Sequence, residues 1–240
     1  MSNYVILNSS AHANTKVITD RGAEYGDNIK YALTFAFEFR NIQSCYPIFF
    51  SKDSETGQFH PIALFGFANN ENLFLDDRGW DATYIPMMIE RHPFLIGYQG
   101  AADPDGDPSP VVSIDMDNPR VSKLKGETLF TDGGKPTAYL EQAVTRLEAI
   151  HRGHEHNKDF VTALLDNDLL EPFTMEIKLN DGSDNQLLGF YTINEDKLSQ
   201  LSGEALSALN TDGHLQPIYM ALASYARVRT LIDKKNAQQT

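Results

Sequence analysis

The chain has 240 residues, with 20 Lys or Arg against 33 Asp or Glu, which gives a formal net charge of −13. Its hydrophobic fraction of 41% excludes a disordered chain, and its acidic balance argues against nucleic acid and anionic membrane surfaces as partners. The single cysteine, Cys45, excludes a disulfide scaffold and any metal site built from several cysteines. We expect Cys45 to be a buried, inert thiol, because it ends an apolar helix face.

The N-terminal segment contains Ala11-His12-Ala13, which resembles a signal-peptidase site. No basic residue precedes it, and the apolar run Val5–Leu7 is too short for a signal peptide. No window approaches 18 consecutive apolar residues, the length that a membrane-spanning helix needs. We therefore expect a cytoplasmic protein.

The first predicted elements are a short strand and a helix. The strand covers Tyr4–Leu7. The helix covers 35–45, where Phe35, Phe39 and Ile42 follow the four- and three-residue spacing of one helix face. Pro47 ends this helix and opens the next strand.

Two hairpins are predicted to follow. The apolar runs Ile48–Phe50 and Ile62–Phe67 flank turn residues and predict the first hairpin. Two further strands are predicted at Phe94–Tyr98 and Val111–Ile114, joined by the turn-rich loop Asp103–Pro110. Asp103, Asp105 and Asp107 alternate in this loop like the start of a calcium loop, but Ile114 stands where the bidentate Glu is required.

The second half of the chain is more helical. An amphipathic helix is predicted through Leu140–Ile150, interrupted at Gly153, and a second helix follows around Phe160–Leu169. A tight hairpin is predicted around Asn180-Asp181-Gly182, the residue types that such turns favour. One long helix is predicted over Ile218–Leu231.

The two halves share a pattern. Phe35 precedes Pro47 by twelve residues, and Phe160 precedes Pro172 by the same twelve, with a strand, a turn and a returning strand after each Pro. Residues 30–98 and 155–228 could therefore be repeated helix–hairpin–helix units, or the match could be chance within a common pattern. We expect an α+β fold in a single domain over 1–240, with antiparallel hairpins and packed helices.

One histidine cluster has the spacing of metal ligands. His151 and His154 are three residues apart and share a helix face, and His156 follows. The segment lacks the His-Glu-x-x-His motif, contains Gly153, and closes a charged helix end where solvated imidazoles are ordinary. We expect neither a metal nor another cofactor, and His151, His154 and His156 stay the candidates if one binds.

Three polar residues next to predicted apolar structure are candidates for acid–base chemistry: His12, Glu38 and Asp115. Shared acid–base catalysis would require these groups to converge. Their alternative roles are capping, turn formation or ion pairing. No complete catalytic motif is present, which favours a protein without catalytic activity.

The densest unusual segment runs from Asn72 to Phe94 and contains the one Trp of the chain. Large rigid aromatic faces, adaptable Met and an Arg suit a peptide-like ligand. The alternative is a core corner between a hairpin and a strand. The candidate binding residues are Trp80, Tyr84, Met87, Arg91 and Phe94.

This segment also carries a family resemblance. Tyr46-Pro-Ile-Phe-Phe, Leu64-Phe-Gly-Phe, Tyr84-Ile-Pro86 and Arg91-His-Pro-Phe94 resemble the SapC family, and further elements match as far as Gly213-His-Leu215. Many members read Arg-Tyr-Pro-Phe where this chain has His92. The family takes its name from a gene linked to secretion of surface-layer protein, and no catalytic residue can be carried over from it.

The resemblance implies a setting for the protein. Similar proteins are encoded beside halogenase-like enzymes acting on tryptophan, cupin-type hydroxylase-like proteins and TonB-dependent receptors. It thus implies a role in peptide or surface-protein modification, secretion or uptake. The first hypothesis is a cytoplasmic, non-catalytic binding or accessory protein for a peptide or a partner protein. The second is an enzyme that modifies peptides or amino acids with acid–base residues.

Overall fold

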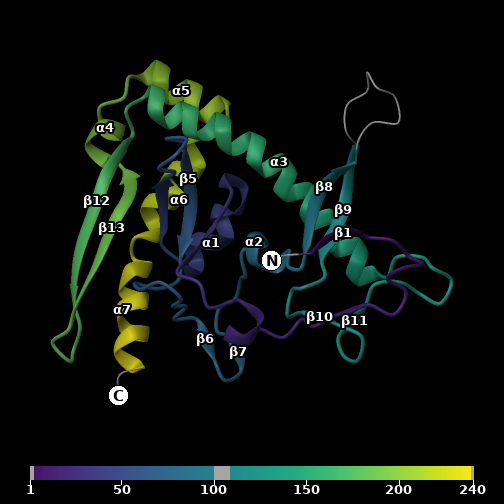
Figure 1. Ribbon diagram of the computed structural model, residues 1–240. Helices are drawn as coiled ribbons and strands as arrows, with labels where there is room; N and C mark the ends of the chain where they lie inside the picture. Colours follow the sequence, from purple (N-terminus) through teal and green to yellow (C-terminus); the bar gives the residue numbers. More distant parts are fainter. Residues whose placement is uncertain (1–2, 100–108, 239–240) are drawn as a thin grey trace. The chain divides into compact units, whose positions relative to one another are not determined.

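The computed structural model describes residues 3–99 and 109–238, and their helices and strands belong to two units (Figure 1). The first unit consists of Met1–Asp27 and Met87–Arg152, and the second of Asn28–Pro86 and Gly153–Thr240. Each unit therefore joins two stretches that are distant in the sequence. The aspartates of the predicted loop Asp103–Pro110 lie outside the described residues.

Two small antiparallel sheets form the first unit. In the order β1-β9-β8, β1 and β8 flank β9; in the order β10-β2-β11, β10 and β11 flank β2. The predicted strands at Tyr4–Leu7, Phe94–Tyr98 and Val111–Ile114 are confirmed within a residue or two. The elements are β1 (Tyr4–Ile6), β2 (Lys16–Val17), η1 (Ala23–Tyr25), α2 (Met87–Glu90), β8 (Phe94–Gln99), β9 (Ser109–Asp115), β10 (Val121–Ser122) and β11 (Glu127–Thr128).

The core of the first unit forms where these strands meet the first part of helix α3 (Ala138–Asp166). Leu140, Ala143 and Leu147 are buried on one face of the helix at three- and four-residue spacing. They form one cluster with Phe94 and Ile114 of the paired strands β8 and β9. The amphipathic pattern of the sequence thus predicts this face correctly.

A buried ion pair ties the loops of the first unit together. Arg120, 1% exposed, donates from Nη2 to Asp27 Oδ2 at 2.5 Å. Its Nη1 donates to the carbonyl oxygens of Ile18, at 3.1 Å, and Asp20, at 2.5 Å. The guanidinium lies 5.1 Å from the ring centre of Tyr25. One side chain therefore links the segment before β10 to the loop between β2 and η1.

A five-stranded antiparallel sheet forms the centre of the second unit, in the order β12-β13-β4-β5-β3. The predicted hairpins at Ile48–Phe67 and Phe173–Thr192 are confirmed as β4–β5 and β12–β13, and they lie side by side in this sheet. The strands are β3 (Tyr31–Leu33), β4 (Ile48–Lys52), β5 (Phe59–Leu64), β12 (Leu170–Lys178) and β13 (Asp184–Ile193); a separate pair is β6 (Leu75–Asp76) with β7 (Gly79–Trp80).

Short helices complete the second unit, together with the part of α3 from Gly153 onward. Phe160 of α3 contacts Phe39 with ring centroids 5.9 Å apart and Phe50 at 6.3 Å, so the helix and the sheet share an aromatic core. The helices are η2 (Ala36–Glu38), α1 (Phe39–Cys45), α4 (Glu195–Ser199), α5 (Gly203–Thr211), α6 (Leu215–Ser224) and α7 (Arg227–Ala237).

Two helix predictions are wrong. Gly153 does not interrupt its helix: α3 runs from Ala138 to Asp166 through this residue. The predicted C-terminal helix Ile218–Leu231 is two helices, α6 and α7, with a break at Tyr225. There the Tyr225 N–H donates to Leu222 O and the Val228 N–H to Tyr225 O, three-residue bonds that tighten the chain and end the α-helical pattern.

The fold class is α+β, as the sequence predicts. Both hairpins of the suggested repeats belong to one sheet, whereas the suggested first repeat, 30–98, includes residues of both units. The duplication and the single domain over 1–240 stay predictions.

Candidate functional site

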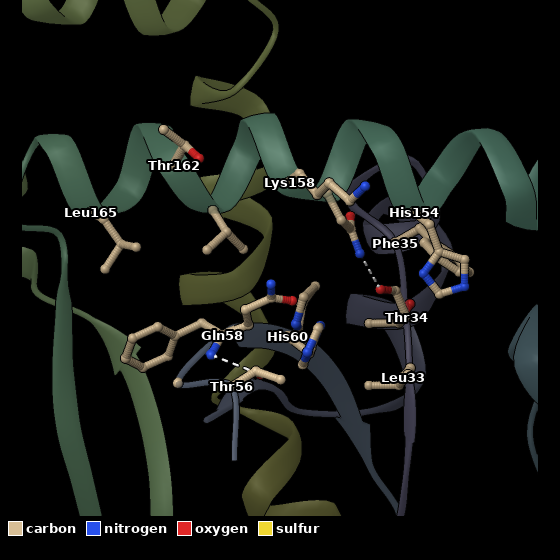
Figure 2. Close-up of a pocket in the computed structure, with 15 residues that line it drawn as sticks. Leu33, Thr34, Phe35, Thr56, Gln58, His60, His154, Lys158, Thr162 and Leu165 are labelled. Carbon is tan, nitrogen blue, oxygen red and sulfur yellow. Dashed lines mark hydrogen bonds between the residues drawn. The ribbon is translucent and has the colours of Figure 1, made fainter. Parts of the chain in front are cut away.

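A cavity of about 540 Å³ lies between the second part of α3 and the residues of β5 with the turn before it (Figure 2). Leu33–Phe35, which end β3 and lead toward η2, close one side. We call it the α3 cavity. All of its lining residues belong to the second unit. Its volume falls within the range of sites that hold small molecules or short peptide segments.

Gly153 allows one wall of the α3 cavity to form. A Cβ atom at this buried position would lie 2.7 Å from the rings of both Phe35 and Phe37. Those two rings stack 5.5 Å apart. Glycine therefore lets the segment 35–37 approach the helix backbone, which explains why the helix keeps a residue of low helix propensity.

Asn157 fixes the same wall by hydrogen bonds. Its Nδ2 donates to Thr34 O at 2.8 Å, drawn as a dashed line in Figure 2, and its Oδ1 accepts from the Ala36 N–H at 3.0 Å. One carboxamide thus satisfies a backbone acceptor and a backbone donor of the segment that faces it. Because both bonds are partly buried, the wall is held against α3 without any charge.

The α3 cavity has an apolar side. Val161 and Leu165 of α3 and Phe59 of β5 line it. Leu165 lies at one end of the helix face in Figure 2, and His154 and Thr34 lie at the other. His154 and Leu165 are eleven residues apart, about 16 Å along a helix that rises ~1.5 Å per residue.

Polar donors occupy the rest of the α3 cavity. His154 and Lys158 come from one face of α3, and His60 and Gln58 rise toward them from β5 and its preceding turn (Figure 2). Lys158 Nζ lies 2.8 Å from Glu155 Oε1, in a pair whose side chains are 67% and 64% exposed. Of the described residues that line the α3 cavity, none is Asp or Glu.

Glu38, one of the predicted acid–base residues, lies behind this wall. It is 1% exposed, and its carboxylate accepts hydrogen bonds from Thr34 Oγ1 at 3.2 Å and from the Tyr84 hydroxyl at 2.7 Å. Thr34 lines the α3 cavity, so one hydrogen bond separates Glu38 from it. Its structural contribution is to fix Thr34 and Tyr84.

From the Glu38 carboxylate, a series of hydrogen bonds continues through the polar groups of three aromatic residues. The Tyr46 hydroxyl donates to the Tyr84 carbonyl at 2.5 Å and accepts from Trp80 Nε1 at 2.7 Å. Burial raises the pKa of Tyr46 far above its ordinary value, so this hydroxyl keeps its proton. The polar tips of Trp80, Tyr84 and Tyr46 are therefore used inside the second unit.

The other predicted acid–base residues lie in the first unit. His12 is 8% exposed, and its Nδ1 lies 3.0 Å from the backbone nitrogen of Asn8. Asp115 Oδ1 accepts from the backbone N–H groups of Asn3 and Asp117. His12 therefore closes a local turn, whereas Asp115 closes a turn and joins it to the distant N-terminal segment at Asn3. Glu38 belongs to the second unit, and joint catalysis by the three stays a prediction.

The predicted aromatic, Met and Arg site is divided between the units. Trp80 and Tyr84 belong to the second unit, whereas Met87, Arg91 and Phe94 belong to the first. Phe94 is 1% exposed in the first core, and Arg91 Nη1 donates to its carbonyl at 3.0 Å. These contacts show packing roles, and ligand binding by the five residues stays a prediction.

The candidate metal ligands point in different directions. His154 lines the α3 cavity, while His156, about 200° further around the helix, lines a second cavity. His151 belongs to the first unit. Within residues 3–99 and 109–238, no group of three or more His, Cys, Asp or Glu side chains is arranged to hold a metal ion.

The second cavity, which we call the α6 cavity, has a different composition. It measures about 610 Å³ and is lined by residues of η2, α1, α3, the turn between α5 and α6, and α6. Arg40, His156 and His214 line it together with Asp159 and Asp212, so both signs of charge are present. Because the described lining of the α3 cavity includes no acidic residue, the α3 cavity has the clearer chemical preference and is the candidate site.

Cys45 fits the expectation of a buried thiol. It is 9% exposed, and its Sγ lies 3.2 Å from Thr83 Oγ1. None of the described lining residues of either cavity is Cys45.

Comparison with protein families settles the relationship of the chain. The family model described as SapC matches residues 7–231 of the 240. The chain belongs to the SapC family. No match was found among curated proteins or among solved structures. The SapC match includes every residue that lines the α3 cavity.

Within the described residues, no helix has both the length and the apolar character that crossing a membrane requires.

Among the residues that line the α3 cavity, the sequence predicts only His154, as a candidate metal ligand, and it does not predict Thr34, Asn157 or Lys158. A usable signal was present in α3. His154, Lys158, Val161, Thr162 and Leu165 recur at i, i+4, i+7, i+8 and i+11, which is one helix face of mixed polarity. Such a face at the edge of an aromatic core is where a cavity with both kinds of lining can form.

Proposed function

We propose that this SapC-family protein is a cytoplasmic, non-catalytic binding or accessory protein for a peptide, and that the α3 cavity holds the peptide. The observation that supports the proposal is the lining: an apolar end formed by Val161, Leu165 and Phe59, next to donors on His154 and Lys158 along the same helix. A peptide presents the same combination of apolar side chains and hydrogen-bonding backbone. The uncharged wall held by Asn157 gives the cavity a fixed shape before a ligand arrives.

The setting of this binding is also a proposal. By association with the family, the peptide belongs to a surface-protein or peptide modification, secretion or TonB-dependent uptake system. The protein partner that receives the bound peptide is then a halogenase-like or hydroxylase-like enzyme.

Blocking the α3 cavity tests the proposal. Gln58 is exposed and extends below α3 in Figure 2, so Gln58→Trp would fill the cavity at little cost to the fold. Gln186→Trp places the same side chain on β13, at an exposed residue outside the cavity lining. The probe is a pool of N-acetylated random pentapeptides, and retained peptides are identified by mass spectrometry after equilibrium dialysis.

We expect the wild type and Gln186→Trp to retain a defined set of peptides and Gln58→Trp to lose it. Thermal unfolding monitored by circular dichroism establishes that both variants are folded. Retention of no peptide by the wild type, or equal retention by Gln58→Trp, would contradict the assignment of the α3 cavity.

The alternative is an enzyme that modifies a peptide or amino acid. The observation that favours it is the buried Glu38 carboxylate, one hydrogen bond behind the cavity residue Thr34. A mass change in a retained peptide that the wild type produces and Glu38→Gln does not would support this alternative. Peptides recovered unchanged support the binding protein.

A further inference from the structure

We propose that the α3 cavity recognises a carboxylate next to an apolar side chain; this inference rests on the proposed function and names the chemistry of its ligand. The proposal rests on the lining residues Lys158, His154 and His60, and on the apolar Val161 and Leu165 further along α3.

The first argument is the sign of the lining charges. Lys158, His154 and His60 can each carry a positive charge or donate a hydrogen bond, and no acid is among the described lining residues. The chain as a whole carries a formal charge of −13, and the α6 cavity contains Asp159 and Asp212. The α3 cavity is therefore a local exception in an acidic protein, and an anion fits it better than a cation.

The second argument is the placement of the donors. His154 and Lys158 are four residues apart on one face of α3, and His60 faces this helix from β5 (Figure 2). The Gln58 side chain lies between the helix and β5. A carboxylate bound here would meet donors from both walls, whereas the Asn157 carboxamide is already engaged by Thr34 and Ala36.

The existing partner of Lys158 does not oppose this assignment. Its pair with Glu155 is exposed on both sides, and exposed pairs three residues apart on a helix contribute little. Lys158 can therefore exchange Glu155 for a ligand carboxylate without disturbing the fold. No Arg is among the described lining residues, so the planar fork that favours phosphate groups is not part of this set.

The third argument is the length of the cavity. From His154 to Leu165 the helix face extends about 16 Å, which corresponds to roughly five residues of extended peptide at ~3.3 Å per residue. A carboxylate held near His154 and Lys158 therefore leaves room for apolar side chains toward Val161 and Leu165. The carboxylate has two sources in a peptide: the free C-terminus, or an Asp or Glu side chain.

Three matched pools of N-acetylated pentapeptides distinguish these sources. The first contains no Asp or Glu, ends in an apolar residue and has a free C-terminal carboxylate. The second is identical but ends in an amide. The third ends in an amide and has one Glu beside the apolar residue. Each pool is tested by equilibrium dialysis against the wild-type protein.

We expect the first or the third pool to bind at least ten-fold more tightly than the second, about 1.4 kcal/mol. A preference for the first identifies a peptide C-terminus, and a preference for the third an acidic side chain. The double variant Lys158→Gln with His154→Gln should reduce the difference to less than three-fold. Lys123→Gln with His156→Gln removes the same two residue types from exposed positions outside the α3 cavity. This control variant should leave the difference in binding between the pools unchanged.

The outcomes separate the two proposals. Equal binding of all three pools would overturn the carboxylate assignment and leave the peptide-binding function in place. A loss in the double variant that is equal for acid and amide pools would also overturn it, because the side chains would then act by packing. Binding of none of the pools would overturn the proposed function together with this inference.

Discussion

Two cations of this SapC-family protein, Arg120 in the first unit and Lys158 in the second, are used in opposite ways. In the first unit a cation is inside: Arg120 is 1% exposed, and its hydrogen bonds go to Asp27 and to the backbone. In the second unit Lys158 is exposed beside a cavity whose wall is held by the uncharged Asn157 and by Gly153. Arg120 thus fixes loops inside the first unit, whereas Lys158 of the second unit stays where a ligand can reach it.

The largest effect is expected from removing the buried cation. Arg120→Met leaves the buried Asp27 with Arg21, 3.6 Å away, as its cationic partner and should lower the free energy of unfolding by about 3 kcal/mol. Hydrogen exchange followed by mass spectrometry should show faster exchange of the backbone amides in 3–27 and 109–128. Arg78→Met, which removes an exposed partner of Asp76, is the control and should produce no measurable change. An equal increase in the exchange rates throughout the second unit would contradict this contrast between the two units.

The next largest effect is expected at the cavity wall. Gly153→Ala introduces a Cβ atom 2.7 Å from two phenyl rings and should cost about 1–3 kcal/mol in urea unfolding. Gly203→Ala is the matched control, since no atom lies within 4 Å of its added Cβ and the backbone there is not left-handed. That variant should be neutral or stabilised by up to about 1 kcal/mol. A neutral Gly153→Ala would show that the wall can move.

Asn157→Ala tests the uncharged clamp with a smaller expected effect. It leaves Thr34 O and the Ala36 N–H without their partner and should cost about 1–2 kcal/mol. Asn167→Ala, directly after the same helix, removes only a bond to the last turn of that helix at Ala163 O. Fluorescence of Trp80, the single tryptophan and a residue of the second unit, reports both unfolding curves. Identical midpoints for the two variants would contradict the role of Asn157.

The smallest effect is a pH dependence in the first unit. Burial lowers the pKa of His92, and the positive charge of Arg91 lowers it further. The unfolded state then binds the proton more readily, so this contribution to stability is present above the unfolded pKa of about 6.5. It is lost as the pH falls from there through the folded pKa.

Urea unfolding of wild type and His92→Asn across this pH range measures that contribution. The wild type should lose more stability on acidification than the variant, while the exposed His156→Gln should follow the wild type. If the free energy of unfolding falls with pH equally in the wild type and in His92→Asn, His92 does not cause the pH dependence.

The hairpins were predictable because their signals are local. Asn180-Asp181-Gly182 marks the turn between β12 and β13, where Gly182 adopts φ 85°. The α3 helix was predictable up to Ile150 by its apolar spacing. Beyond that point a local rule failed at Gly153, because the reason for a glycine there lies in Phe35 and Phe37, more than a hundred residues away.

The candidate site was less predictable for the same reason. Thr34 and Asn157 are 123 residues apart, and no periodicity in either segment shows that one carboxamide joins them. The aromatic segment around Trp80 was conspicuous by composition, yet its polar tips are bonded to Tyr46 and Glu38 within the second unit. The unusual composition around Trp80 therefore marked residues that pack within the second unit. The cavity is lined by a face of α3 whose composition is not unusual.

The order of strands in the five-stranded sheet has a consequence for synthesis of the chain. β4 joins the other hairpin through β13, with only Phe50 and Ser51 opposite Tyr191 and Phe190. Until residues 184–193 leave the ribosome, the β4–β5 hairpin presents β4, with its apolar Ile48–Phe50, as an open edge. Such an edge is a template for pairing with another chain. In the interval between translation of β4 and of β13, the chain is therefore exposed to aggregation through this edge.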